Sequence, residues 1–154
     1  MPQLFPHARA GLALIAWLLT AAHALAANPP AGELIVRDAW VRQPPPGSDV
    51  GAAYLSLSNT GSHAVSVVAF DCPLAEAAML HETRIESGVA RMRAQAALAV
   101  AAGETVVLKP GGLHVMLHGL KQPLAVGQHV PLVLTLADGR TVSVSAIVRP
   151  IGSE

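Results

Sequence analysis

The sequence predicts an all-β fold, an antiparallel sandwich or barrel, from three observations. Short apolar segments recur at close intervals, and several alternate apolar and polar residues as half-buried strands do. Turn-forming pairs separate these segments, and both Asp138-Gly139 and Ser87-Gly88 are typical of β-hairpins. No long segment with a helical period follows the first 26 residues. Many short strands without long helices indicate a closed or two-layered β structure.

Each strand is predicted from its residue pattern and from the turn that ends it. The first ends before Pro44-Pro45-Pro46-Gly47, because proline fixes φ and lacks an amide donor. Residues 130–136 alternate most regularly, with Val130, Leu132, Leu134 and Leu136 on one face. Strands are expected at residues 34–42, 52–58, 64–70, 79–86, 89–94, 105–108, 113–118, 130–136 and 141–148.

Two segments have competing preferences. Residues 73–78 contain Leu-Ala-Glu-Ala-Ala, which favours helix and predicts one short helical turn. Residues 95–102 also have high helix propensity, but they lie between predicted strands. We therefore expect residues 95–102 to be extended.

Length and charge limit the possible function. A chain of 154 residues can bury the core of one domain. Ten basic and ten acidic side chains cancel, and only 13% of residues are charged, so no nucleic-acid surface or polybasic membrane patch is indicated. The sequence has no paired carboxylates, nucleophile motif or His-Glu-x-x-His motif, and we therefore expect no enzyme.

The first 26 residues have the pattern of a cleaved export signal. Arg9 supplies positive charge, residues 10–22 form an apolar segment, and Ala24-Leu25-Ala26 matches a small-x-small cleavage site. An uncleaved anchor is the alternative, but the apolar segment is short for a bilayer span. No cysteine directly follows it, so a lipoprotein anchor is not indicated. We expect a signal at 1–26, a linker at 27–33 and one β domain at 34–150.

Four residues form a candidate site for a soft metal ion: His81, Met92, His114 and Met116, in the pattern His-x10-Met-x21-His-x-Met. Thioether sulfur is polarizable and suits copper(I), whereas zinc and copper(II) prefer imidazole, carboxylate or thiolate donors. His114 and Met116 are two residues apart, so they share one face of a strand. His81 and Met92 lie on opposite arms of the expected Ser87-Gly88 hairpin, which can bring them together.

Several neighbours leave the limits of this site open. Met79 could replace Met92 or be a spare thioether, although a strand methionine is more often core. His118 would share the face of His114 if the strand extends so far, but a surface histidine is the simpler interpretation. Trp40 could pack near the site or in the ordinary core. Glu82 should point away from the face of His81.

Cys72 has no partner for an intramolecular disulfide. We expect it to be a small buried hydrophobic residue. The alternative is an exposed thiol that dimerises or competes for copper, and the sequence assigns Cys72 no role.

The ligand pattern and its flanking motifs resemble the periplasmic copper chaperone family PCu(A)C over about residues 34–148. The motifs that carry the resemblance are Asp38-Ala39-Trp40-Val41, Pro45-Pro46-Gly47, Gly51-Ala52-Ala53-Tyr54-Leu55, Leu80-His81-Glu82-Thr83, Met92-Arg93 and Pro110-Gly111-Gly112-Leu113-His114-Val115-Met116-Leu117.

This resemblance implies a cupredoxin-like antiparallel β-barrel or sandwich with Greek-key connections. It also implies that His81, Met92, His114 and Met116 bind one copper(I) ion per chain. The expected task is delivery of copper in the periplasm toward the binuclear copper centre of cytochrome c oxidase. The copper subunit itself or a Sco-type protein would accept the ion, and we expect a monomer. Some members carry a His/Met-rich tail for a second ion, but this chain ends Ile151-Gly152-Ser153-Glu154.

Two alternatives come from other functional classes. A blue-copper electron-transfer protein would share the fold but needs a cysteine thiolate beside two histidines, and Cys72 lies nine residues before His81. A metal-free secreted interaction module would bind no copper.

Overall fold

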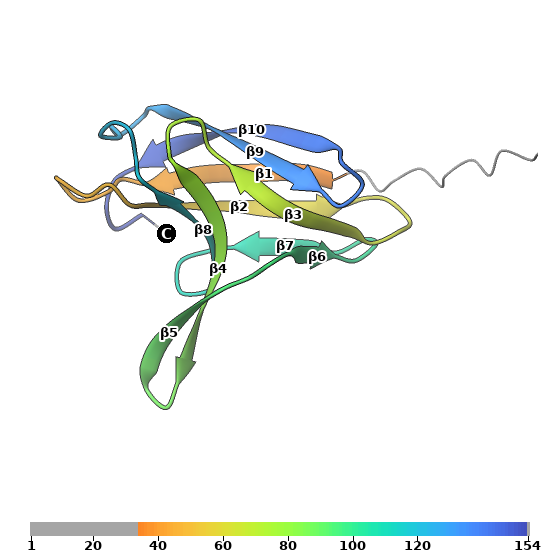
Figure 1. The fold of residues 1–154 in the computed structure, drawn as a ribbon. Helices are drawn as coiled ribbons and strands as arrows, with labels where there is room; N and C mark the ends of the chain where they lie inside the picture. Colours follow the sequence, from red (N-terminus) through yellow and green to blue (C-terminus); the bar gives the residue numbers. More distant parts are fainter. Residues whose placement is uncertain (1–33, 154) are drawn as a thin grey trace, which may run out of the picture.

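The computed structural model describes residues 34–153 and consists there of strands and turns (Figure 1), which confirms the all-β class. The predicted signal at 1–26 and linker at 27–33 lie outside the described residues. Over residues 34–153, no helix has the length and apolar character needed to cross a membrane. The strands are β1 (Leu34–Arg42), β2 (Gly51–Asn59), β3 (Val65–Asp71), β4 (Ala77–Glu86), β5 (Val89–Ala94), β6 (Leu98–Val100), β7 (Thr105–Leu108), β8 (Leu113–His118), β9 (His129–Leu136) and β10 (Thr141–Arg149).

Seven strands close into a barrel in the order β4, β8, β2, β1, β10, β9 and β3. A pairing between Phe70 of β3 and Ala78 of β4 completes the ring. The other three strands extend it, because β5 pairs with β4, β6 with β3 and β7 with β2. The candidate ligands therefore lie on β4 and β8, which are neighbouring strands of the barrel, and on β5 beside them.

One pair departs from the expected antiparallel pattern. β1 and β10 are parallel, with Trp40 opposite Ile147 and Arg42 opposite Arg149. Strands joined by a tight turn must be antiparallel, but β1 and β10 are the first and last strands and have no direct connection. They can therefore pair in either relative direction. Their parallel pairing joins β1 to β10, which in turn pairs with β9.

The core consists of aliphatic side chains from alternate positions of the strands. Val130, Leu132, Leu134 and Leu136 of β9 are all buried, as the alternation predicts. The same buried cluster contains Leu55 and other inward residues: Val41, Leu57, Val67, Val115, Leu117 and Val148. No charged residue belongs to this cluster in the part of the chain that the structure describes, so the apolar interior holds the strands at fixed positions.

A β-bulge in β1 changes which of its residues face the core. The register with β2 shifts by one residue between Arg37 and Trp40, and Asp38 has a positive φ of 51°. The extra residue moves Val41 to the inside and Trp40 to the outside. Trp40 is still buried, but in the outer layer rather than in the ordinary core that we considered.

The β4–β5 hairpin projects from the barrel (Figure 1). β8 pairs with β4 from Ala77 to Glu82, whereas the rest of β4 pairs only with β5. The hairpin turns at Ser87 and Gly88, whose φ values of 52° and 78° match the left-handed conformation that a two-residue hairpin loop requires. The predicted hairpin is thus confirmed, but its outer half has no layer packed on it.

The predicted helical turn at residues 73–78 is wrong. Residues 73–76 form a turn, and β4 already begins at Ala77. The backbone N–H of Glu76 donates to the carbonyl oxygen of His118 at 2.9 Å. Pairing with β8 thus outweighs local helix propensity, since so short a helix is not stable alone. Within residues 95–102, residues 98–100 form the strand β6 and no residue is helical, so the expected extended structure is confirmed for the centre of the segment, whereas residue 96 bends and residue 102 begins a turn.

A buried leucine should contribute far more to stability than an exposed aliphatic residue. Leu134 is fully buried, so Leu134→Ala should lower the free energy of unfolding by about 2–5 kcal/mol. The control Val126→Ala alters a half-exposed turn residue and should change it by about 0.5 kcal/mol or less. Urea denaturation measures both changes, and similar losses in the two variants would contradict this core.

Candidate metal centre

The register between β4 and β8 brings two of the predicted ligands into direct opposition. His81 is the Cα partner of His114, and Met79 is the partner of Met116. Directly opposite residues of antiparallel strands project to the same face, with Cβ atoms about 4.5–5.5 Å apart. The two imidazole rings lie edge to face, with centroids 6.0 Å apart. Both histidines and Met116 therefore occupy one patch on the outer face of the barrel.

His114 is the best-fixed residue of the patch. Only 5% of it is exposed, and its Nδ1 lies 2.9 Å from the carbonyl oxygen of Gly112. If Nδ1–H donates to this oxygen, the lone pair is on Nε2. A hydrogen bond of this kind orients a metal-binding imidazole and fixes its tautomer.

His81 has a buried nitrogen with no hydrogen-bond partner. Its Nδ1 is enclosed, and no polar group within the described residues satisfies it. Burial is the largest cause that lowers the pKa of His81, and repulsion from His114 and then from His118 lowers it further. Around neutral pH the ring is therefore uncharged and has a lone pair to donate.

Met92 is diagonal to His81 across the hairpin. It pairs with Thr83, and the direct partner of His81 on β5 is Ala94. Diagonal neighbours lie about 7–8 Å apart, which long side chains can span. Met92 is 53% exposed, so its thioether lies on the open side of the patch.

Two further donors, Met79 and His118, share the face. Met79 is on β4, two residues before His81, and is 45% exposed. His118 ends β8, and its ring centroid is 6.1 Å from that of His81. The strand does extend to His118, so Met79 and His118 both lie beside the candidate ligands.

An aromatic wall closes the side of the patch next to β2. Tyr54 packs against His114 with ring centroids 6.4 Å apart, and Trp40 packs against Tyr54 at 4.4 Å. The guanidinium groups of Arg42 and Arg149 lie over the Tyr54 and Trp40 rings at 5.6 Å and 5.1 Å. Burial is the main cause that raises the pKa of the Tyr54 hydroxyl, so the phenol itself carries no charge. Tyr54 and Arg42 are the neighbours of the site that sequence reasoning missed.

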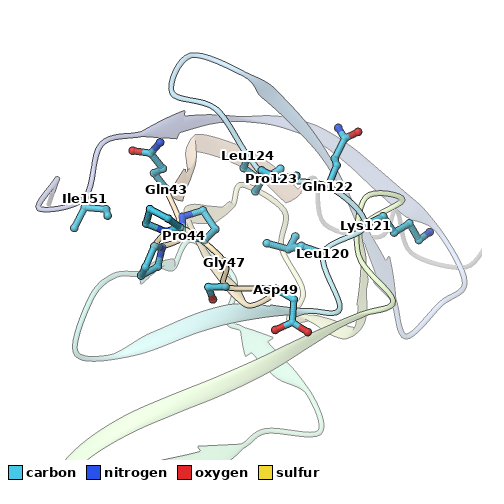
Figure 2. A pocket seen from close by; sticks show the side chains of 13 residues that line it. Gln43, Pro44, Gly47, Asp49, Leu120, Lys121, Gln122, Pro123, Leu124 and Ile151 are labelled. Carbon is cyan, nitrogen blue, oxygen red and sulfur yellow. The ribbon is translucent and has the colours of Figure 1, made fainter.

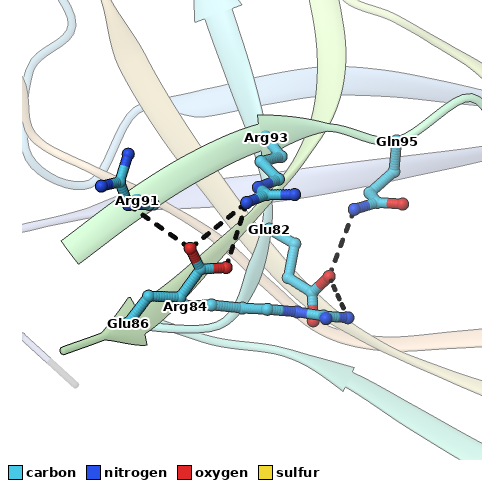
Figure 3. Close-up of polar contacts among 6 residues, drawn as sticks. All are labelled: Glu82, Arg84, Glu86, Arg91, Arg93 and Gln95. Atoms are coloured by element: carbon cyan, nitrogen blue, oxygen red, sulfur yellow. Dashed lines mark hydrogen bonds and ion pairs between the residues drawn. The ribbon is translucent and has the colours of Figure 1, made fainter. Parts of the chain in front are cut away.

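The opposite face of the hairpin is charged (Figure 3). Glu82 pairs with Arg84 at 2.8 Å and accepts a hydrogen bond from the amide of Gln95 at 3.2 Å. Glu86 contacts Arg91 and Arg93 at 3.3 Å and 3.1 Å. Glu82 thus points away from His81, as predicted, and the carboxylates stay off the metal-binding face.

Cys72 is buried in the core cluster, as predicted for a small hydrophobic residue. Burial is the largest cause that raises the pKa of its thiol, which keeps the sulfur protonated. Its side chain belongs to the barrel interior, whereas the candidate ligands lie on the outer face. Cys72 therefore offers no thiolate to the site.

None of the candidate ligands lines the hollow shown in Figure 2. It has a volume of about 590 Å³ and lies between residues 43–49 and residues 120–124. Its polar side chains include Asp49 and Lys121, but no histidine or methionine lines it. A soft metal ion would find its donors on the β5–β4–β8 face instead.

The donor set itself favours copper(I). Among residues 34–153, no group of three His, Cys, Asp or Glu side chains is placed to hold a metal ion. The donor atoms that this face presents are those of the two facing imidazoles and of the thioethers beside them. Such a mixed neutral set suits a soft monovalent ion better than zinc or copper(II).

Comparison with known proteins identifies relatives over most of the described chain. The family model for "Putative lipoprotein LpqE-like" proteins matches residues 34–148. A protein of Leifsonia xyli subsp. xyli described as "Putative lipoprotein Lxx21020" is 39% identical over 115 residues, which are 74% of this chain and 68% of that protein.

Comparison with solved structures finds similar folds in copper-binding proteins. The chain resembles apo-DR1885 from Deinococcus radiodurans at 34% identity, with 97% of this chain and 94% of that chain covered and a TM-score of 0.60. The copper(I) form of DR1885 is 36% identical over 84% and 85% of the two chains, with a TM-score of 0.61. The copper-bound PCuAC domain from PmoF2 shares the fold, at 18% identity, 78% and 95% coverage and a TM-score of 0.66. These matches confirm the expected cupredoxin-like fold.

The lowered pKa of His81 should be measurable without metal. In an NMR titration of the apo protein, the His81 ring protons should have a midpoint below that of a histidine model peptide, because burial disfavours imidazolium. His118→Gln removes one repulsive neighbour, so the midpoint should rise while staying below the peptide value. A wild-type midpoint at or above the peptide value would contradict the burial of this ring.

Proposed function

The chain belongs to the LpqE-like family of PCu(A)C-type domains, and from this premise we propose that it is an exported copper(I) chaperone. The observation that carries the proposal is the direct opposition of His81 and His114 on β4 and β8, with Met116 on the same face. A relative more than one-third identical over most of its length has been solved with copper(I) bound.

We assign the ligands to His81, Met92, His114 and Met116, and one ion to each chain. His114 Nε2 is free once Nδ1 donates to Gly112, and His81 has an unpartnered ring nitrogen. Met116 follows His114 by two positions on the same face, and Met92 lies diagonally across the hairpin. Because all four donors come from one chain, a monomer suffices.

Release by ligand exchange follows from the unequal exposure of these residues. The donors are neutral, so the ion keeps its charge and is held less tightly than by thiolates. His114 is almost fully buried, whereas Met92 on the projecting hairpin is exposed. An incoming thiolate would therefore displace Met92 first and His114 last, and copper would pass through a complex that shares it between two proteins.

We propose that the ion is delivered in the periplasm toward the binuclear copper centre of cytochrome c oxidase, directly or through a Sco-type protein. Acceptors of this kind present cysteine thiolates, which bind copper(I) more tightly than imidazole and thioether do. The signal pattern at residues 1–26 supports export. The description of the Leifsonia relative as a putative lipoprotein points to export in the same family.

The second candidate is electron transfer by a blue-copper site, because blue-copper proteins share the cupredoxin-like fold. Such a site needs a cysteine thiolate, and Cys72 is buried in the apolar core with its pKa raised. The protein loaded with copper(II) should therefore show no intense blue absorption band. Appearance of such a band would favour electron transfer over carriage.

Copper(I) competition with a chromophoric chelator tests the assignment. Wild-type protein should bind one equivalent, and His114→Ala or Met116→Ala should each weaken binding by at least about tenfold, since each removes a donor. The same variants should keep the far-ultraviolet circular dichroism of the wild type, because the donors lie outside the apolar core.

His129→Ala is the matched control. His129 is an exposed residue of β9 whose Nδ1 lies 3.0 Å from the Ser145 hydroxyl, and it belongs to another part of the barrel. Its loss should leave copper(I) affinity unchanged. Unchanged affinity in both ligand variants would refute the ligand assignment, and absence of binding by the wild type would favour a metal-free interaction module.

A further inference from the structure

One thioether on the metal-binding face lies outside the His-x10-Met-x21-His-x-Met pattern. We propose that Met79 is a further copper(I)-binding residue, which holds the ion on the barrel when Met92 is displaced. The inference rests on the proposed function and adds a residue and a step to it.

The strand register places Met79 beside the proposed ligands, although Met79 is not part of the ligand sequence pattern. Met79 is the direct partner of Met116, just as His81 is the direct partner of His114. Since Met79 and His81 are two positions apart on β4, the four side chains form two adjacent rows on one face. One row is Met79 and Met116, the other is His81 and His114, and each crosses from β4 to β8. Met79 is also 45% exposed, so its sulfur is open to an ion.

Met92 and Met79 flank His81 on opposite sides along β4. Met92 pairs with Thr83, two residues toward the hairpin tip, whereas Met79 is two residues toward the barrel. Met92 is therefore two rows from Met116 along the strands and is separated from β8 by β4. Met79 is next to Met116 in the same row. An ion held by Met116 and the facing histidines thus has a near thioether in Met79 and a more distant one in Met92.

The two methionines also differ in how firmly the fold holds them. Every residue of β5 is exposed, so only cross-strand pairing with β4 keeps Met92 in place. Met79 lies between Ala78, which pairs with both β3 and β8, and Leu80, which is buried in the core. Movement of the hairpin toward a partner would carry Met92 away and leave Met79 beside the ion.

This arrangement gives transfer an intermediate with copper still on the barrel. An incoming thiolate forms a bond to copper(I) as the bond to Met92 breaks, and the thioether leaves uncharged. Met79 then supplies a sulfur donor to an ion that His81, His114 and Met116 still hold. No oxidant or reductant is required, because copper remains copper(I) throughout. The ion is therefore not left undercoordinated in water between the two proteins.

Methionine methyl NMR tests the contact directly. Protein labelled with ¹³C at the methionine methyl groups is titrated with copper(I) under reducing conditions, and Met79, Met92 and Met116 are assigned from Met→Leu variants. In Met92→Leu protein, the Met79 methyl resonance should shift together with that of Met116 up to one equivalent. A Met79 resonance that stays in place while Met116 shifts would overturn the inference.

A double-mutant cycle tests whether the two methionines substitute for each other. Copper(I) affinity is measured for wild type, Met79→Leu, Met92→Leu and the double variant. Each single variant should lose less than about tenfold, and the double variant should lose clearly more than the product of the two losses. A double variant no weaker than Met92→Leu would overturn the role of Met79.

Ile85→Leu is the control for hydrophobic change on this face, because Ile85 is an exposed residue of the same hairpin and has no donor atom. Its affinity should equal that of the wild type. Absence of copper(I) binding by the wild type would overturn both the proposed function and this inference. Binding that depends on His114 and Met116 but is indifferent to Met79 would overturn this inference alone.

Discussion

The hydrogen-bonded register between β4 and β8 is the constraint on which the candidate site depends. It puts His81 opposite His114 and Met79 opposite Met116. A shift of one residue would turn one set of side chains into the core, because side chains alternate between the faces of a strand. The buried Leu80 and Val115, which are partners on the inner face, oppose such a shift. The apolar core thus positions the face that carries the candidate ligands without contributing a donor atom to it.

The residues around the paired histidines bury one side of the candidate site and leave the other side exposed. On the closed side, the bulge in β1 brings Trp40 to the outer layer, where it packs on Tyr54, and Tyr54 packs on His114. On the open side, the hairpin presents Met92 and keeps its charged pairs on the opposite face. Rigid burial of one proposed ligand and exposure of another suit a carrier, because copper must be both retained and accessible.

Much of the fold follows from local sequence pattern, but the arrangement of strands does not. Alternation locates β9, and Ser87-Gly88 locates the hairpin, because both signals lie within a few residues. Spacing also places His114 and Met116 on one face. Which strand lies beside β8 depends on packing of the whole barrel, so the facing of Met79 with Met116 has no local signal. The turn at residues 73–76 and the bulge at Asp38 likewise reflect pairing with distant strands, which local propensity does not record.

Because the hairpin projects from the barrel, the rate at which a bound ion is released can differ from the rate at which the barrel unfolds. The outer half of the hairpin has no core residues, so it can open as a local unit at a small fraction of the free energy needed to unfold the barrel. In the proposed ligand assignment, the rate at which Met92 exposes the ion is then set by opening of a two-stranded hairpin, on a timescale faster than global unfolding. Substitutions in the hairpin can therefore change how quickly the proposed cargo leaves without altering the buried core of the barrel.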